Sequence, residues 1–408
     1  MKISYVCEQF KGWRYGGSET SLTILADYMR KKGHHIHFIV GKTTNLEMSS
    51  KVRYACSKNK YLELFCSATL GYDPIALNSS LKVFKKIRPD VIDVYSNSYQ
   101  LSLAPIFAAK KLGIPVLVTI RDYSWICPYG NLLKLCEQNC SETSWENCIN
   151  CIHNDQRSFK RFLSKIVPRQ TSELIKRAMY NTLKVLRGEI IVANSRYVKN
   201  VLTRFGFDKN KIVVIPPPID LNEFQPPFSY EKNVLWVGSF IKEKGPKYFI
   251  KIANYFKNEL GYPDINFIMI GGGPLIGDYS KEKNVKILGK LPYKDVINYY
   301  KNAYAIVVTS IWPEPFGRVA PEAMACEKPV LAFASGGLTE SIIDGKNGFI
   351  TPPKDYTMLS KKLALLFDNR KLAFEMGLNG RKNVAEKYSL EVVGRQYESL
   401  YYKMTQKP

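Results

Sequence analysis

Two glutamates in the C-terminal half of the chain have the chemistry to bind a ligand that carries hydroxyls and phosphate. Glu314 and Glu322 have seven residues between them in the segment EPFGRVAPE, which follows the apolar stretch AIVVTSIW and is expected to enter a helix near Gly317. The first turn of a helix offers free backbone amides and a positive dipole end to a phosphate. A carboxylate beside it can accept hydrogen bonds from sugar hydroxyls. As a bare pair, the two glutamates would also fit a solvated surface.

A group of cysteines lies in the first half of the chain, between Cys127 and Cys151. Three residues separate Cys136 from Cys140, two separate Cys148 from Cys151, and His153 follows. Closely spaced cysteine pairs are typical of tetrahedral structural zinc, although the first pair is wider than the commonest short knuckle. A structural zinc site on Cys136, Cys140, Cys148 and Cys151, one or two disulfides, and unlinked thiols are therefore three open alternatives.

A strongly basic segment follows the cysteines. From Arg157 to Arg187 there are nine Lys or Arg residues and one acid, Glu173. Apolar residues alternate with its basic residues in the first part, namely Phe159, Phe162, Leu163, Ile166 and Val167 with Lys160, Arg161 and Lys165. This composition is typical of a helix that lies on an anionic membrane surface. The alternative is a solvated basic face over the first domain.

The elements that would position these residues follow an alternating strand and helix pattern. A strand from Ile3 to Cys7, a loop around Gly16 and Gly17, an amphipathic helix and a strand from Ile36 to Val40 form a βαβ unit. The helix has its apolar face at Leu22, Leu25, Ala26 and Met29. Further buried-strand patterns cover residues 91–96, 115–120, 190–195 and 211–218. The first half is therefore predicted to be a parallel α/β sheet.

The second half repeats this pattern after a proline-rich stretch. Residues 216–232 carry five prolines and no helical period, which indicates a linker. Strand patterns then cover residues 234–239, 266–272, 285–289, 305–310, 329–334 and 348–352. We expect an α/β protein of two Rossmann-like, doubly wound parallel-sheet domains that face an interdomain cleft, since such sheets bind ligands beyond the carboxyl ends of their strands. The expected boundaries are 1–217, a linker at 218–232, 233–385, and a C-terminal helix, 386–408, that crosses back to the first domain.

Composition agrees with a globular protein of two domains and limits its partners. The chain has 408 residues, of which 45% are hydrophobic and 23% charged, and cores rarely grow beyond roughly 150 to 200 residues. The net charge of +23 favours an anionic partner: nucleic acid, anionic lipid or a phosphate-bearing substrate. There is neither a membrane-spanning apolar run nor a signal-peptide pattern at the N-terminus, so we expect a cytoplasmic location.

The glutamate segment belongs to a longer pattern. Residues 314–353, EPFGRVAPEAMACEKPVLAFASGGLTESIIDGKNGFITPP, resemble the donor-binding region of family 4 retaining glycosyltransferases, which have the type B glycosyltransferase fold. Further similar segments are VGSFIKEKGP (237–246), GGGP (271–274), IIVANS with the following IDLNEF, and GGSE (16–19), so the resemblance covers most of the chain. Some members of this family carry a cysteine-bearing insertion where this chain has its cysteines.

The resemblance implies a role for each matching residue. Glu314 would hydrogen-bond the donor sugar, Glu322 would hold the ribose hydroxyls, and amides around Phe316 and Gly317 would contact sugar and phosphate. Lys244 would neutralise the donor diphosphate.

Gly16 and Gly17 would allow the backbone of the first domain to approach the same diphosphate. The alternative for the two glycines is an ordinary strand-to-helix turn.

Two positions depart from the family pattern. Where the family often has Gly-Arg before the lysine, this chain has Gly238 and Ser239, so Arg318 is a candidate replacement for the missing phosphate-binding cation; the alternative is a solvated arginine at a helix start. Arg121 stands where a histidine is common near the reacting sugar. An arginine cannot act as a base, but it can bind a sugar hydroxyl or phosphate oxygen, oriented by Asp122, or it can be part of a structural turn.

The expected chemistry needs neither a metal nor a protein base. The chain contains no Asp-x-Asp pair, the usual carboxylate clamp for a divalent ion on a sugar diphosphate. Lysine, amides and a helix dipole would neutralise the departing nucleotide. In the family, the retaining reaction is written as same-face attack, with a leaving phosphate oxygen accepting the proton of the acceptor.

We therefore expect transfer of a hexose from a nucleotide diphosphate sugar to a glycan, lipid-linked at the cytoplasmic membrane face. One alternative is a sugar-nucleotide epimerase of the same fold, and another is a basic, non-enzymatic anion-binding protein. Nucleic acid is not an expected partner, since no recognition module is visible.

Overall fold

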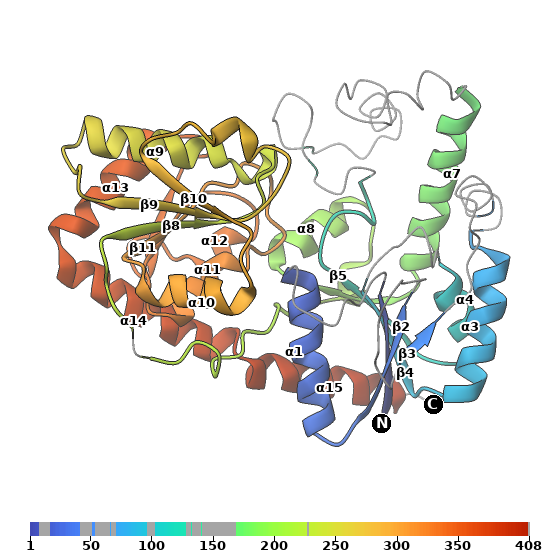
Figure 1. The fold of residues 1–408 in the computed structure, drawn as a ribbon. Coiled ribbons are helices and arrows are strands. Elements are labelled where there is room, and N and C mark those ends of the chain that lie inside the picture. Colours follow the sequence, from blue (N-terminus) through green and yellow to red (C-terminus); the bar gives the residue numbers. More distant parts are fainter. Residues whose placement is uncertain are drawn as a thin grey trace. The chain divides into compact units, whose positions relative to one another are not determined.

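The computed structural model describes residues 1–7, 17–40, 51–53, 66, 71–95, 103–127, 132, 140, 169–226 and 228–406. These residues form two compact units, each around one parallel sheet (Figure 1). The first unit consists of Met1–Ile215 together with Gly394–Pro408, and the second of Pro216–Val393. The prediction of two Rossmann-like α/β domains is confirmed.

The sheet of the first unit has seven parallel strands in the order β3-β2-β1-β4-β5-β6-β7. The strands are β1 (Lys2–Cys7), β2 (His35–Val40), β3 (Lys51–Arg53), β4 (Val91–Val94), β5 (Val116–Ile120), β6 (Ile190–Ala193) and β7 (Ile212–Val214). All but β3 lie within or next to the predicted strands. The order reverses between β1 and β4, which is the arrangement of a doubly wound sheet.

Among its described residues, the first unit has helices α1 (Gly17–Lys31), α3 (Pro74–Ile87), α4 (Ala104–Lys111), α7 (Arg169–Leu186) and α8 (Arg196–Arg204). The predicted apolar face of α1 is buried, at Leu22, Leu25, Ala26 and Met29. Local sequence explains where α3 starts: the Asp73 side chain accepts a hydrogen bond from the Ile75 amide at 2.8 Å, and Pro74 occupies the first turn.

The second unit has six parallel strands in the order β10-β9-β8-β11-β12-β13. They are β8 (Asn233–Val237), β9 (Asn266–Ile270), β10 (Val285–Gly289), β11 (Ala305–Val308), β12 (Val330–Phe333) and β13 (Gly348–Thr351). The helices are α9 (Pro246–Asn258), α10 (Tyr293–Asn302), α11 (Val319–Ala325), α12 (Leu338–Ser341), α13 (Tyr356–Asp368) and α14 (Arg370–Lys387).

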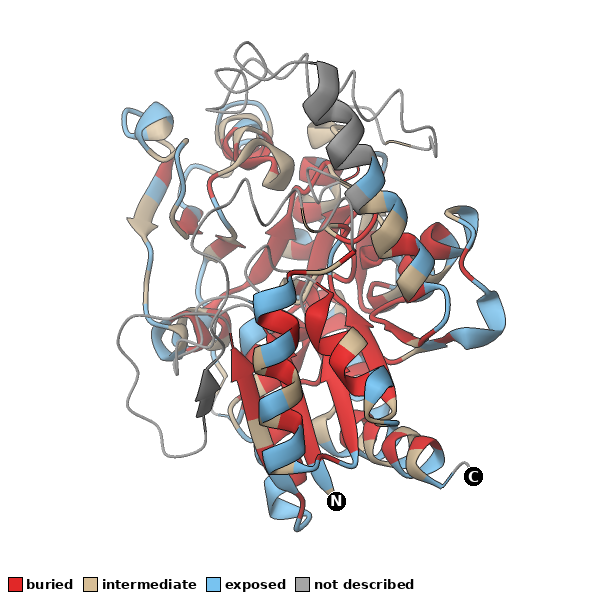
Figure 2. Ribbon diagram, turned by 90° about the vertical axis from the view of Figure 1, so that its right-hand side faces the viewer, coloured by how far each residue is buried: buried red, intermediate tan, exposed pale blue. Residues whose placement is uncertain are grey.

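Successive strand residues of the second unit point to opposite faces and fill two separate apolar cores. On β8, Val234 and Trp236 join the core that includes residues of α9 and α13, whereas Leu235 joins the core that includes residues of α10 and α11. A parallel sheet with helices on both faces needs such strands, which are apolar throughout. Figure 2 shows the same layering in the first unit, with buried strands and helices whose outer faces are exposed.

The last helix, α15 (Leu390–Thr405), begins in the second unit, and its residues from Gly394 onward belong to the first. Within the first unit, the Tyr401 hydroxyl donates a hydrogen bond of 2.7 Å to the buried Asp93 carboxylate, and His34 contacts Glu398 at 2.8 Å. The C-terminal helix is therefore tied to the sheet by polar contacts as well as by apolar packing.

Candidate functional site

The loop between β11 and α11 carries Glu314 at the carboxyl end of the sheet of the second unit. A neighbouring loop after β12 packs directly on its backbone, where the Gly337 amide donates a 2.7 Å hydrogen bond to the Glu314 carbonyl. A Cβ atom at Gly336 would lie 2.3 Å from that same carbonyl oxygen. Gly317, just before α11, has a φ of +81°. Glycines therefore allow the close approach and the turn that set the Glu314 backbone.

The Glu314 carboxylate is buried and held by two partners from the second unit. Its Oε1 atom accepts hydrogen bonds from the Lys244 ammonium and from the Ser310 hydroxyl, each at 2.6 Å. Its side chain is 5% exposed, against 27% for Lys244. The Lys244 ammonium also lies 4.9 Å from the centre of the Trp312 ring. A buried carboxylate is thus paired with a cation that remains partly open to solvent.

Lys244 is positioned by contacts between two loops. It ends a short 3₁₀ turn, Lys242–Lys244, after β8, and the next residue, Gly245, has a φ of +63°. The Thr309 hydroxyl donates to the Gly245 carbonyl at 2.9 Å, and the Ile311 amide donates to the Glu243 carbonyl at 2.9 Å. Since β8 and β11 are neighbours in the sheet, their carboxyl ends bring Lys244 to Glu314 across a sequence separation of 70 residues.

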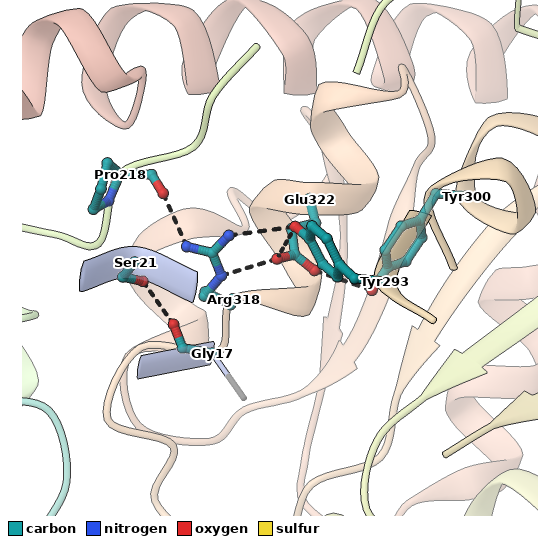
Figure 3. Close-up of polar contacts among 7 residues, drawn as sticks. All are labelled: Gly17, Ser21, Pro218, Tyr293, Tyr300, Arg318 and Glu322. Carbon is teal, nitrogen blue, oxygen red and sulfur yellow. Dashed lines mark hydrogen bonds and ion pairs between the residues drawn. The ribbon is translucent and has the colours of Figure 1, made fainter. Parts of the chain in front are cut away.

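Glu322, on α11, lies in a second polar cluster of the same unit, shown in Figure 3. Arg318 forms an ion pair with it, from Nε to Oε1 at 2.9 Å, and the side chains are 9% and 7% exposed. The Tyr293 hydroxyl donates to the same Oε1 at 2.9 Å, and the Tyr300 hydroxyl reaches Oε2 at 3.4 Å. Arg318 Nη1 also donates to the Pro218 carbonyl at 2.9 Å.

The electrostatics of this cluster favour charged Arg318 and protonated tyrosines. Burial raises the pKa of Tyr293 above its ordinary value, and the Glu322 charge acts in the same direction. Burial, followed by the Glu322 charge, likewise raises the pKa of Tyr300. Although burial opposes the charge of Arg318, Glu322 and Tyr293 hold its pKa above the usual value. Both tyrosines therefore remain hydrogen-bond donors.

Three other predicted residues of the second unit are spread around this edge of the sheet. Ser239 is exposed just beyond β8. The Phe316 ring is 4% exposed and packs edge-on against Tyr388 at 5.4 Å between ring centres, so only its backbone is suited to ligand contact. Arg318 is engaged with Glu322 and Pro218 rather than with solvent.

The first unit holds the remaining predicted site residues. Gly17 begins α1, and Gly16 lies outside the described residues. Arg121 follows β5 and is 7% exposed. Its guanidinium lies 5.1 Å from the centre of the Tyr95 ring, and Nη2 donates to the Tyr397 hydroxyl at 3.5 Å. Within the described part of the chain, its Nε and Nη1 atoms are buried without a hydrogen-bond partner.

Asp122, predicted to orient Arg121, accepts hydrogen bonds from the amide and the hydroxyl of Ser124, at 2.8 and 2.5 Å. Near Arg121 lies a buried carboxylate that the sequence did not single out. Burial raises the pKa of Asp93 to about 7, although hydrogen bonds from Thr119 and Tyr401 and the charge of Arg121 act in the opposite direction.

The cysteine and basic segments lie mostly outside the described residues. Of the proposed ligands, Cys136, Cys148 and Cys151 fall outside them, and the Cys140 amide donates to the Leu132 carbonyl at 2.7 Å. In the ranges that the structure covers, no three His, Cys, Asp or Glu side chains are grouped so that they could hold a metal ion. Residues 157–168 are likewise outside, and no described helix is long and apolar enough to span a bilayer.

The sequence did not reveal four residues at this edge of the sheet, namely Ser310, Trp312, Tyr293 and Tyr300. Ser310 lies four residues before Glu314, which places it on the same loop, and this spacing is the only sequence signal for its contact. The two tyrosines lie on α10, more than 20 residues away from Glu322 along the chain, and no local pattern connects them to it.

Comparison with known proteins agrees with this arrangement. A family model described as Glycosyltransferase Family 4 matches residues 15–223, more than half of the chain, and one described as Glycosyl transferases group 1 matches residues 220–383. The chain therefore belongs to these glycosyltransferases. Its two parallel α/β units are those of the type B glycosyltransferase fold.

Individual relatives support the same family, and a solved structure supports the fold. Over 223 residues, 52% of the chain, it is 33% identical to the uncharacterized glycosyltransferase MJ1178 of Methanocaldococcus jannaschii. Over 229 residues, 53% of the chain, it is 27% identical to the capsular polysaccharide biosynthesis glycosyltransferase CapM of Staphylococcus aureus. Each match spans 59% of the relative. Anabaena Alr3699/HepE in complex with UDP superposes with a TM-score of 0.69, at 18% identity, over 99% of this chain and 100% of that one.

Proposed function

We propose that the protein is a retaining glycosyltransferase that transfers a hexose from a nucleotide diphosphate sugar to a glycan acceptor. The observation that carries this proposal is the ion pair of 2.6 Å between Lys244 and the buried carboxylate of Glu314, beside the start of α11. A cation for a diphosphate and a carboxylate for sugar hydroxyls are brought together there by neighbouring strand ends. The family membership of the chain and the bound UDP in the HepE structure support the same class of donor.

In this proposal, donor binding separates the ion pair. The Lys244 ammonium turns to the diphosphate, and the Glu314 carboxylate accepts a hydrogen bond from the sugar while Ser310 continues to donate to it. Backbone amides at Phe316 and Gly317 contact sugar and phosphate. Glu322 binds the ribose. Without a ligand, Lys244 and Glu314 neutralise each other. When the donor binds, its diphosphate replaces Glu314 as the partner of Lys244, and a sugar hydroxyl replaces Lys244 as the partner of Glu314.

The remaining predicted residues complete the donor site in this proposal. Ser239, Gly16 and Gly17 line the diphosphate with groups that are small enough for close contact. Arg121 binds a sugar hydroxyl or phosphate oxygen through the two guanidinium nitrogens, Nε and Nη1, that have no hydrogen-bond partner within the described residues. Arg318 acts on the donor through Glu322, because its guanidinium is already bound to that carboxylate.

The transfer step forms a bond from the acceptor oxygen to the anomeric carbon as the bond to the leaving phosphate oxygen breaks. Attack occurs on the face that the nucleotide leaves, so the anomeric configuration is retained, and the leaving phosphate oxygen takes the acceptor proton. Lys244 and loop amides stabilise the charge that develops on the diphosphate. We propose no metal in this step, since the sequence has no Asp-x-Asp clamp.

For the acceptor we propose a lipid-linked glycan at the cytoplasmic face of the membrane, in surface polysaccharide or protein N-glycan assembly. The basic and apolar composition of residues 157–187 supports docking of a peripheral protein on an anionic surface. CapM, a relative by sequence, is described as a glycosyltransferase of capsular polysaccharide biosynthesis. For the cysteines at 136, 140, 148 and 151 we propose no part in the transfer, whether they hold structural zinc, form disulfides or stay as unlinked thiols.

Nucleotide affinity tests the donor site directly. Titration calorimetry with UDP, GDP and ADP should find tight binding of one of them, and Lys244→Ala should weaken it about tenfold or more, as expected for a charge-assisted contact. Lys251→Ala is the matched control, because this exposed lysine on α9 has its ammonium over the Tyr356 ring. Equal affinities of the two variants would contradict the assignment of Lys244.

A further inference from the structure

We propose that Tyr293 and Arg318 are positioning residues that fix the Glu322 carboxylate so that its Oε2 atom accepts a hydrogen bond from a single ribose hydroxyl of the donor. This inference rests on the proposed function and deepens the role of the same site. It follows from the unequal occupancy of the two oxygens of this carboxylate.

The Oε1 atom is already filled. It accepts from Arg318 Nε and from the Tyr293 hydroxyl, both at 2.9 Å, and a carboxylate oxygen has two lone-pair sites. The Oε2 atom accepts from the Tyr300 hydroxyl at 3.4 Å, which is long for a bond between oxygens. Within the described residues, Oε2 is thus the oxygen with room for another donor.

The two groups on Oε1 are held from different parts of the unit. Tyr293 is the first residue of α10, and Arg318 immediately precedes α11 (Figure 3). Arg318 is anchored a second time through Nη1 to the Pro218 carbonyl at 2.9 Å, and its Nη2 atom lies 3.4 Å from the Tyr293 hydroxyl. The guanidinium and the phenol therefore brace each other as well as the carboxylate, which leaves the carboxylate little freedom to rotate.

The held Glu322 carboxylate should bind ribose differently from a glutamate that is free to rotate. A free carboxylate can take both hydroxyls of a ribose, one on each oxygen. Here a second hydroxyl would have to displace Tyr293 or Arg318 from Oε1, at the cost of a charge-assisted hydrogen bond. One ribose hydroxyl should therefore dominate recognition.

The experiment first identifies which of UDP, GDP and ADP binds the wild-type protein by calorimetry. The 2′-deoxy, 3′-deoxy and 2′,3′-dideoxy forms of that nucleotide are then compared. One monodeoxy form should bind about tenfold more weakly, as weakly as the dideoxy form, and the other within about twofold of the parent. Equal, large losses for both monodeoxy forms would overturn the single-hydroxyl assignment.

Variants then test the positioning role. Tyr293→Phe should weaken the ribonucleotide about five- to tenfold and leave the affinity for the dideoxy form unchanged, because only the ribose contact depends on the held carboxylate. Arg318→Lys, which keeps the charge and loses the guanidinium geometry, should show the same pattern. Tyr299→Phe is the matched control, since Tyr299 lies on the same helix and packs partly buried against the same apolar core.

Different results would contradict the proposed function and the positioning role of Tyr293. Absence of binding for all three ribonucleotides by the folded protein would contradict the proposed function itself. Normal ribonucleotide binding with equal losses for ribonucleotide and dideoxy form in Tyr293→Phe, or with no loss in either, would overturn only the positioning role. Thermal unfolding midpoints confirm that each variant is folded, and if Tyr293→Phe does not fold, Arg318→Lys decides.

Discussion

Glu314 and Glu322 are both buried carboxylates, yet their environments differ. Glu314 is paired with a lysine that keeps 27% of its side chain exposed, whereas the arginine beside Glu322 keeps 9%. A ligand can draw the lysine away from Glu314 more easily than it can displace Arg318, which has a second anchor at Pro218. Glu314 therefore suits a contact that changes during the reaction, and Glu322 one that does not.

The first prediction separates the two glutamates by kinetics. Glu314→Gln should lower kcat and kcat/KM together, since a contact to the reacting sugar strengthens as positive charge develops on its ring. Glu322→Ala should act mainly by raising the donor KM, because ribose is remote from the bond that breaks. The changes should be roughly ten- to a hundredfold. Steady-state rates measure both, and a folded Glu314→Gln variant with wild-type kcat would contradict the placement of the sugar.

A second prediction concerns Asp93, whose folded-state pKa of about 7 lies above the ordinary value because of burial. The unfolded chain loses this proton near pH 4, so between roughly pH 4 and 7 the folded state binds more protons and stability falls as pH rises. Asp93→Asn removes this dependence. Its stability relative to the wild type should improve by on the order of 2 kcal/mol from pH 5 to pH 8.

Urea unfolding at the two pH values measures this shift. Asn keeps the size of the side chain and offers groups to the hydroxyls of Thr119 and Tyr401, which now donate to the carboxylate. A constant difference between variant and wild type at pH 5 and pH 8 would show that Asp93 is ionised across this range.

At the scale of elements, the loop after β12 packs against the loop between β11 and α11 and so fixes the position of the Glu314 backbone. A Cβ at Gly336 would meet the Glu314 carbonyl at 2.3 Å, with φ at +55°; Gly345 has a similar φ of +73° but nothing within 4 Å of its Cβ position. Gly336→Ala should therefore cost about 1 to 3 kcal/mol more in unfolding free energy than Gly345→Ala. It should also lower kcat/KM.

Because both glycines adopt the left-handed region, Gly345→Ala carries the same kind of backbone strain without the clash. Urea unfolding and turnover of the two variants isolate the contact with Glu314. If both lose equal stability and turnover, the loop after β12 does not determine the position of Glu314.

The strands of both sheets could be predicted because each is a short apolar run between helical patterns. The stretches PVLVTI and AIVVTS became β5 and β11, within one or two residues at their ends. The strand β3 was missed, since it has three residues, Lys51–Arg53, and two of them are charged. Local pattern gives no signal for so short an edge strand.

Family pattern and sheet topology predicted several residues of the candidate site, but they did not predict the contacts between the side chains. The pairing of Lys244 with Glu314 follows from the carboxyl ends of adjacent strands, but neither the ion pair nor the contacts of Arg318 could be read from spacing. A solvated Arg318 was one expectation, yet tertiary packing buries it against Glu322 and Pro218. Contacts between side chains on separate elements are set by packing, which leaves no periodic trace in the sequence.

At the scale of the whole molecule, the net charge of +23 is concentrated partly in the segment from Arg157 to Arg187. Replacement of Lys160, Arg161 and Lys165 together by Glu should release the protein from anionic vesicles, since each basic residue near such a surface contributes about 1 kcal/mol. Nucleotide affinity should not change. Cosedimentation with phosphatidylserine vesicles measures release, and undiminished vesicle binding would remove the support for a membrane-bound acceptor.

Product analysis with the whole protein tests hexose transfer from a nucleotide diphosphate sugar most directly. Purified protein in excess EDTA is incubated with nucleotide diphosphate hexoses, with and without lipid-linked and free glycans, and products are followed by mass spectrometry and anomeric NMR signals. We predict that one hexose joins the acceptor for each nucleoside diphosphate released, with the anomeric configuration of the donor. A sugar that is altered while still attached to the nucleotide, independently of acceptor, would contradict the claim and indicate an epimerase.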